Sequence, residues 1–152
     1  MTHAEVPIFT DDNWESMGTP AHTNGNISKT VWDESGEVFY VGGDFTWIGD
    51  VQAYSVAKWH NGEWSALGSN ALDVYQPSNV DDLFFIGADL IADGIFYHAA
   101  DDDRAYGLHR WDGSRWVPFG PEEHFFIGTD LYATGDFSEF GGPEGHGIGK
   151  WD

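Results

Sequence analysis

The fold of this chain is decided by the segment Lys58–Trp64, which reads KWHNGEW. Asn-Gly is a two-residue hairpin signal, so Trp59 and Trp64 are predicted to lie on adjacent antiparallel strands. The pattern returns as RWDGSRW in Arg110–Trp116, where Asp-Gly supplies the turn, and its beginning returns as KWD in Lys150–Asp152. Three of the six basic residues of the chain therefore occupy one recurring position, which indicates an internal repeat.

Two further markers recur with a spacing of about 50 residues. Tryptophan followed after three residues by glycine occurs at Trp14–Gly18, Trp64–Gly68 and Trp116–Gly120. A short apolar run that ends at glycine and is closed by phenylalanine occurs once per repeat, as GEVFYVGGDF, GADLIADGIF and GTDLYATGDF. Short runs of β-branched and aromatic residues bounded by turn residues are typical of strands.

The sequence thus predicts an all-β protein of the β-propeller type. We expect an N-terminal extension over residues 1–12 and a segment of three blades over residues 13–152. The repeats are placed at about 14–63, 64–115 and 116–152, each a four-stranded antiparallel blade, the third shortened. Twenty glycines and only two methionines agree with many tight turns and little helix.

The repeat resembles the Trp-rich propeller repeats of bacterial surface and secreted proteins, which are similar in layout to kelch and galactose-oxidase central domains. The resemblance rests on WSALG at Trp64–Gly68, VFYVGGDF at Val38–Phe45 and VAKW at Val56–Trp59, and it covers about residues 13–152. It implies a fold and an exported or surface location. It does not imply one activity, because such repeats serve as scaffolds for many kinds of site.

Three blades do not close a propeller, which usually has at least four. Open sheet edges invite association. The chain reaches Asp152 where a turn and a tryptophan are due, and the stretch Asp11–Trp14 supplies both. One prediction is therefore a homodimer in which two copies form a six-bladed ring. The alternatives are a fragment of a larger propeller, a ring completed by a partner protein, and a self-contained small sandwich.

The composition excludes several classes of function. The chain carries 26 acidic against 6 basic side chains, a net charge of −20, so binding to nucleic acid or to an anionic membrane surface is disfavoured. Without cysteine there is no disulfide and no thiol chemistry. We expect no membrane insertion, because no apolar run approaches the ~18 residues of a span, and the N-terminal sequence does not read as a signal peptide.

Candidate binding residues come from the loops that follow the closing phenylalanines. Trp47 stands in the first such loop, and His98 and Glu139 take the corresponding places in the second and third. An aromatic side chain in a loop favours either ligand stacking or cover for a neighbouring apolar patch. The tryptophans that recur in every repeat favour packing between sheets instead.

A candidate metal site is the run Asp101-Asp102-Asp103. Loops rich in carboxylate oxygens suit Ca²⁺, although the run lacks the spacing of a known calcium loop, so a solvated acidic loop is the alternative. The seven histidines show no metal-ligand spacing, and no other cofactor is expected.

The sequence therefore favours a non-enzymatic binding or interaction module, completed by self-association and able to bind a glycan. The alternatives are a structural or assembly protein and a glycan-active enzyme. No motif supports an enzyme, because the chain contains no nucleophile elbow, P-loop or dinucleotide motif. A glycosidase needs two carboxylates, but with 26 acidic residues the presence of such a pair does not indicate one.

Overall fold

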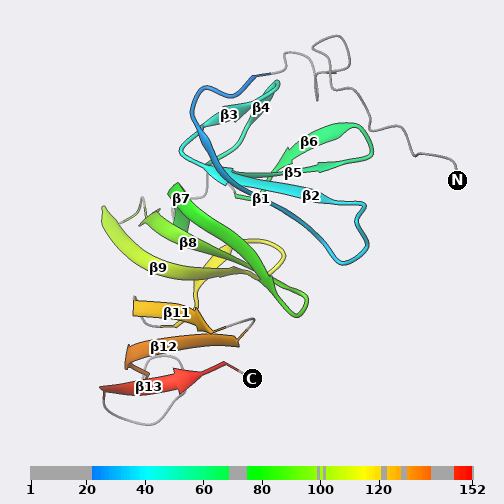
Figure 1. The fold of residues 1–152 in the computed structure, drawn as a ribbon. Helices are drawn as coiled ribbons and strands as arrows, with labels where there is room; N and C mark the ends of the chain where they lie inside the picture. Colours follow the sequence, from blue (N-terminus) through cyan, green and yellow to red (C-terminus); the bar gives the residue numbers. More distant parts are fainter. Residues whose placement is uncertain are drawn as a thin grey trace, which may run out of the picture.

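The computed structural model of the chain describes residues 22–68, 75–98, 100, 102–120, 123–127, 130–137 and 146–151. Every regular element within these residues is a β-strand, so the prediction of an all-β protein is confirmed. Figure 1 shows that the three larger antiparallel sheets follow one another along the chain, with the second lying between the first and the third.

The first sheet has four strands in the order β1-β2-β5-β6. Their bounds are β1 (Ile27–Trp32), β2 (Phe39–Gly43), β5 (Val56–His60) and β6 (Glu63–Ala66). The order follows the chain because each strand returns beside its predecessor, as short turns between antiparallel strands dictate.

The hairpin predicted from Asn61-Gly62 is confirmed. Both residues have positive φ, 51° and 84°, which a two-residue turn of the type that fits strand twist requires. The turn sets the register, so that Trp59 lies opposite Trp64 with ring centroids 5.1 Å apart. The tryptophans of this repeat therefore pack on each other.

A small hairpin is inserted between β2 and β5. It consists of β3 (Trp47–Ile48) and β4 (Val51–Gln52), and it brings Ile48 onto the first sheet beside the buried Phe45. Burial of these apolar side chains fixes the hairpin against the sheet.

The second sheet also has four strands, and three of them are longer than those of the first. Their bounds are β7 (Tyr75–Ile86), β8 (Asp89–His98), β9 (Asp103–Trp111) and β10 (Trp116–Pro118). Strands β7, β8 and β9 are successive neighbours, and β10 pairs with β9 over its whole length. One further pairing, Trp116 with Tyr75, joins β10 to the start of β7.

The hairpin predicted between Trp111 and Trp116 is confirmed, since these two residues lie opposite each other. The predicted two-residue turn at Asp112-Gly113 is wrong, because residues 112–115 connect the strands and, of the predicted pair, Gly113 alone has a positive φ, 98°. The backbone N–H groups of Arg115 and Ser114 donate to the Asp112 carboxylate, both over 2.9 Å. These bonds, with that of the Ser114 hydroxyl, lower the pKa of Asp112 to about 2. The ionised carboxylate of Asp112 therefore accepts the hydrogen bonds that hold this turn.

The third sheet contains three strands in the described part of the chain. They are β11 (Glu123–Ile127), β12 (Asp130–Asp136) and β13 (His146–Lys150), in the order β11-β12-β13. In the first two sheets the Trp-x-x-x-Gly motif begins on the last strand, β6 or β10. The predicted repeat limits at 63/64 and 115/116 therefore fall at the start of that last strand rather than between sheets.

Two of the recurring glycines are explained by close approach of backbone. Gly43 pairs with Ile27 and Gly94 pairs with Val80, each beside a bulge in the first strand of its sheet. A Cβ on either glycine would overlap the carbonyl oxygen of the preceding asparagine, Asn26 or Asn79. The glycine of the repeated apolar run is thus required by the same contact in both sheets.

The recurring cation defines two faces for every sheet. Cross-strand pairs Tyr40–Lys58, Ile91–Arg110 and Tyr132–Lys150 occupy the same place in the three sheets. We call the face that bears Lys58, Arg110 or Lys150 the cation face. The opposite face, which bears Trp59, Trp111 or Trp151, is the tryptophan face. Side chains alternate between the two along each strand.

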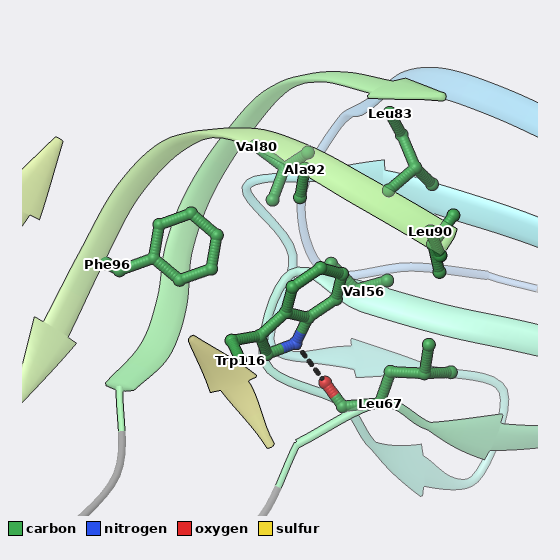
Figure 2. Packing of buried hydrophobic residues seen from close by; sticks show 8 residues of the cluster. All are labelled: Val56, Leu67, Val80, Leu83, Leu90, Ala92, Phe96 and Trp116. Carbon is green, nitrogen blue, oxygen red and sulfur yellow. Dashed lines mark hydrogen bonds between the residues drawn. The ribbon is translucent and has the colours of Figure 1, made fainter. Parts of the chain in front are cut away.

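The sheets stack cation face to tryptophan face. Between the first and second sheets, Tyr40 meets Phe85 edge-on with ring centroids 5.6 Å apart. Between the second and third, Phe84 meets Phe126 edge-on at 4.9 Å. Figure 2 shows the larger of the two cores, which contains Val56 of the first sheet and Trp116 of the second. Both junctions therefore use the same pair of faces.

Candidate functional site

Within the described residues, no further sheet packs on the cation face of the third sheet. Two residues before the recurring cation, on the same face, stand Val56, Leu108 and Ile148. Val56 is 0 % exposed and Leu108 2 % exposed, because the next sheet packs on them, whereas Ile148 is 66 % exposed. The same position is thus core in two sheets and surface in the third.

Neighbouring side chains extend this apolar surface. Phe125 lies opposite Tyr132 and stacks on it, with ring centroids 5.5 Å apart and planes 10° from parallel. Ile127, two residues after Phe125, is also exposed. We call Phe125, Ile127, Tyr132 and Ile148 the open face. Contiguous exposed apolar side chains of this kind mark interaction sites in folded proteins.

The tryptophan face of the first sheet is the other end of the stack. It carries a row of aromatic side chains in which each is the cross-strand neighbour of the next: Trp32, Phe39, Trp59 and Trp64. The β3–β4 hairpin packs against Phe39 and Trp64. Trp32 is 56 % exposed and contacts Phe39 at 4.8 Å between ring centroids.

Two of the recurring cations form ion pairs within their own sheets. Arg110 Nη1 lies 3.4 Å from Asp89 Oδ2, and Lys150 Nζ lies 2.9 Å from Asp130 Oδ2. The two aspartates occupy the same place at the start of β8 and β12. All four side chains are partly exposed, so each pair contributes little to stability. In these two sheets the recurring cation therefore has a structural role, because it pairs with an aspartate on the neighbouring strand.

Polar side chains bridge both junctions. Lys29 Nζ of the first sheet lies 2.8 Å from Asp82 Oδ1 of the second. At the other junction His124 Nε2 lies 3.5 Å from Asp93 Oδ2. Burial raises the pKa of Asp93, His124 opposes this, and Asp81 and Asp82 raise it further. A raised carboxyl pKa is also found at catalytic acids, but here a polar contact between two sheets accounts for the position of the group.

Trp47 and His98, both predicted to lie in loops, instead lie on strands of different sheets. Trp47 opens β3 and is 45 % exposed, and its backbone N–H donates to the Asn24 side-chain oxygen over 2.8 Å. His98 ends β8, where its ring lies 5.0 Å from that of Tyr75. Glu139 lies outside the described residues. Trp47 is therefore an exposed aromatic on a backbone that Asn24 holds in place.

The predicted Ca²⁺ loop is described in part. Asp101 lies outside the described residues. Asp102 accepts a hydrogen bond from the Tyr97 hydroxyl over 2.8 Å, and Asp103 accepts one from the Tyr75 hydroxyl over 3.2 Å. Within the described ranges no three metal-ligating side chains are grouped in a way that would hold an ion. Calcium binding stays a prediction.

The recurring tryptophans that the structure describes pack on aromatic side chains, two pairs of them within one sheet rather than between sheets as predicted. Trp116 also lies in the core between the first and second sheets, and Trp14 lies outside the described residues. Trp111 and Trp116 lie 5.4 Å apart between ring centroids, and Trp151 meets Phe119 edge-on at 4.6 Å. The open face, by contrast, was not predicted. Aligning the third repeat on its cation would have placed Ile148 with Val56 and Leu108, but the sequence does not tell which sheets are covered.

Comparisons of the chain with protein-family models, with curated proteins and with solved structures find no match. The part of the chain that the structure describes contains no helix long and apolar enough to cross a membrane. The functional argument therefore starts from the open face.

Proposed function

We propose that the protein is a non-enzymatic interaction module whose three sheets are blades of a β-propeller, completed by self-association through the open face. The observation that carries this proposal is the 66 % exposure of Ile148, where Val56 and Leu108 are buried by a following sheet. Leaving such a face in water forgoes about 25 cal/mol for each Å² of apolar surface that a partner would cover. Association supplies the missing cover.

The expected result for the native chain is a mass near twice 16.9 kDa by light scattering on a size-exclusion column. Ile148→Asp is expected to run as a single chain, because a carboxylate on the open face would be buried without a partner. The matched control is Tyr106→Asp, which alters an exposed aromatic side chain of the second sheet. A native chain that stays single, or an Ile148→Asp protein that keeps the double mass, would overturn the proposal.

Salt should be varied in this measurement. Each copy carries a net charge of −20, so two copies repel each other at low ionic strength. At about 0.15 M salt the screening length is about 8 Å, and the repulsion between distant charges is largely removed. We expect the double mass to be favoured as salt is raised.

The exposure of Trp47 favours a second function, the binding of a glycan. Its ring is available to stack on the apolar face of a sugar, and its backbone is held by Asn24. For a glycan found to bind in an array, Trp47→Ala is expected to weaken binding by more than about tenfold, as loss of a central aromatic contact does. The control is Trp32→Ala, and calorimetry gives the affinities. Unchanged affinity of Trp47→Ala would exclude this role.

A further inference from the structure

We propose that the outer edge of β13 binds an extended segment of another protein, which adds a strand to the third sheet and places an aromatic side chain opposite Trp151. Among the described residues β12 is the strand that pairs with β13, and Figure 1 shows β13 at the edge of its sheet. Sheet edges bind extended peptides through main-chain hydrogen bonds, and side-chain contacts give the specificity. The inference concerns this edge and does not rest on self-association through the open face.

The first two sheets show what lies beside the strand equivalent to β13. In them the recurring cation is carried by β5 and β9, and a short strand, β6 or β10, pairs with each on the side away from the preceding strand. Trp64 of β6 lies opposite Trp59, and Trp116 of β10 lies opposite Trp111. Trp151 directly follows its cation, as Trp59 and Trp111 do. A strand added in the same way beside β13 therefore places an aromatic ring opposite Trp151.

The exposure of Trp151 agrees with the lack of such a ring among the described residues. Trp151 is 45 % exposed, although Phe119 of the second sheet contacts it. Trp59 and Trp111, which each contact a second tryptophan across the strand pair, are partly buried. An aromatic ring on an added strand would cover more of Trp151, and such pairs contribute more than the area that they bury.

The backbone of the added strand has an acceptor in the carbonyl oxygen of Ile148. In the first sheet the Leu67 N–H donates to the Val56 carbonyl over 3.1 Å, and in the second the Phe119 N–H donates to the Leu108 carbonyl over 2.8 Å. Both donors are the third residue after the tryptophan of the Trp-x-x-x-Gly motif. Ile148 takes the place of Val56 and Leu108 two residues before the cation, so its carbonyl is the equivalent acceptor.

The pairing of β13 with β12 shows that this carbonyl points to the outer edge. The Trp151 N–H donates to the Leu131 carbonyl of β12 over 2.9 Å. In an antiparallel pair the backbone groups of successive residues point alternately towards and away from the partner strand. Ile148 lies three residues before Trp151, so its C=O points away from β12 and towards the added strand.

The donor residue of the added strand also packs its side chain. Leu67 lies in one core cluster with Val56, and Phe119 packs on the cluster that contains Leu108. The equivalent side chain of a bound segment would lie beside Ile148, which is 66 % exposed. The strand that fits this edge therefore has an aromatic residue followed, three positions later, by a large apolar residue.

The charge of the chain selects among such segments. With a net charge of −20, the chain attracts a basic segment and repels an acidic one. Its own two strands provide an example of each, because Arg115 directly precedes β10 whereas β6 begins at Glu63. The partner is therefore a basic, extended segment with an aromatic residue that lies opposite Trp151.

Two synthetic peptides with blocked ends test this inference by calorimetric titration into the full chain. The peptide SRWVPFG has the sequence of residues 114–120 and carries one positive charge, and GEWSALG has that of residues 62–68 and carries one negative charge. We expect SRWVPFG to bind more tightly than GEWSALG at low ionic strength. The difference between the two affinities is expected to shrink as salt is raised, because salt screens the charge of the chain.

Modified peptides test each contact separately. N-methylation of the phenylalanine of SRWVPFG removes the N–H that would donate to the Ile148 carbonyl, and alanine in place of its tryptophan removes the ring opposite Trp151. Each change is expected to weaken binding by about fivefold or more. In the chain, Trp151→Ala is expected to weaken binding of SRWVPFG similarly. Its matched control is Trp32→Ala, which removes an exposed tryptophan of the first sheet and is expected to leave the affinity unchanged.

The outcomes are decisive in either direction. Near-ultraviolet circular dichroism checks that both variants are folded, and the peptide modifications need no variant of the chain. Weaker binding on N-methylation, on loss of the peptide tryptophan and in Trp151→Ala supports the inference. It is overturned if SRWVPFG does not bind, as when another segment of the chain already covers this edge. It is also overturned if the N-methylated peptide binds as tightly as SRWVPFG, or if Trp151→Ala and Trp32→Ala change the affinity equally.

Discussion

Replacing Trp116 with alanine is expected to lower the free energy of unfolding by about 4 to 8 kcal/mol. Trp116 is 1 % exposed and lies in the core between the first and second sheets (Figure 2). Its indole N–H donates to the Leu67 carbonyl over 2.8 Å. Truncation of a buried tryptophan costs about 3–5 kcal/mol, and a carbonyl left unpaired in a buried site adds about 1–3 kcal/mol. Urea unfolding followed by far-ultraviolet circular dichroism measures the loss.

The matched control is Trp32→Ala, which removes the same side chain from a 56 % exposed position. At a concentration low enough to keep the chain single, it is expected to cost less than about 1 kcal/mol. Trp116→Phe is expected to fall between the two, because it keeps the aromatic ring but loses the N–H donor. Equal costs for Trp116→Ala and Trp32→Ala would contradict the placement of Trp116 as the centre of this core.

Local signals in the sequence were enough to predict the hairpins. Asn61-Gly62 determines its two-residue turn and thereby the register of Trp59 and Trp64. At Asp112-Gly113 the hairpin was predicted correctly but the turn was not, because four residues connect Trp111 and Trp116. The recurrence of tryptophan also indicated packing: Trp59 contacts Trp64 and Trp111 contacts Trp116, whereas Trp151 contacts Phe119. These predictions needed no contact between distant residues.

The rest of the arrangement depends on contacts between sheets. The contact of His124 with Asp93 joins residues 31 positions apart on different sheets, and no spacing rule relates them. The β3–β4 hairpin is held by the burial of Ile48 beside Phe45. This contact exists only in the folded first sheet and could not be predicted from the sequence. Exposure of Ile148 likewise depends on which sheet follows, since its sequence context matches that of Val56.

The burial of His109 was also not predicted from the sequence. His109 is almost fully buried, and its ring stacks on Phe96 with centroids 3.6 Å apart and planes 15° from parallel. Its Nδ1 lies 3.3 Å from the Gly107 carbonyl oxygen, which can only accept, so Nδ1 carries the proton. Among the described residues no hydrogen-bond partner meets its buried Nε2. A charged imidazole is therefore disfavoured here, and burial lowers the pKa of His109 from 6.5 to about 4.

This histidine is expected to make the fold less stable in mild acid. In the unfolded chain the imidazole binds its proton near pH 6.5, whereas in the folded chain it does so near pH 4, so the unfolded state binds more protons between these values. The stability that the neutral ring provides is complete above pH 6.5 and is lost as the pH falls towards 4. A depression of this size corresponds to about 3 kcal/mol in full, and to about 2 kcal/mol between pH 7 and pH 5.

The variant His109→Leu isolates this contribution, because leucine fills a similar volume and does not titrate. Urea unfolding of both proteins at pH 7 and pH 5 gives four free energies of unfolding. The many carboxylates and the other six histidines are common to both proteins, so their effects cancel when the two pH differences are subtracted. The native chain is expected to lose about 2 kcal/mol more than the variant on acidification. Equal losses would mean that His109 is protonated in the folded protein as easily as in the unfolded chain, and hence that its ring reaches water.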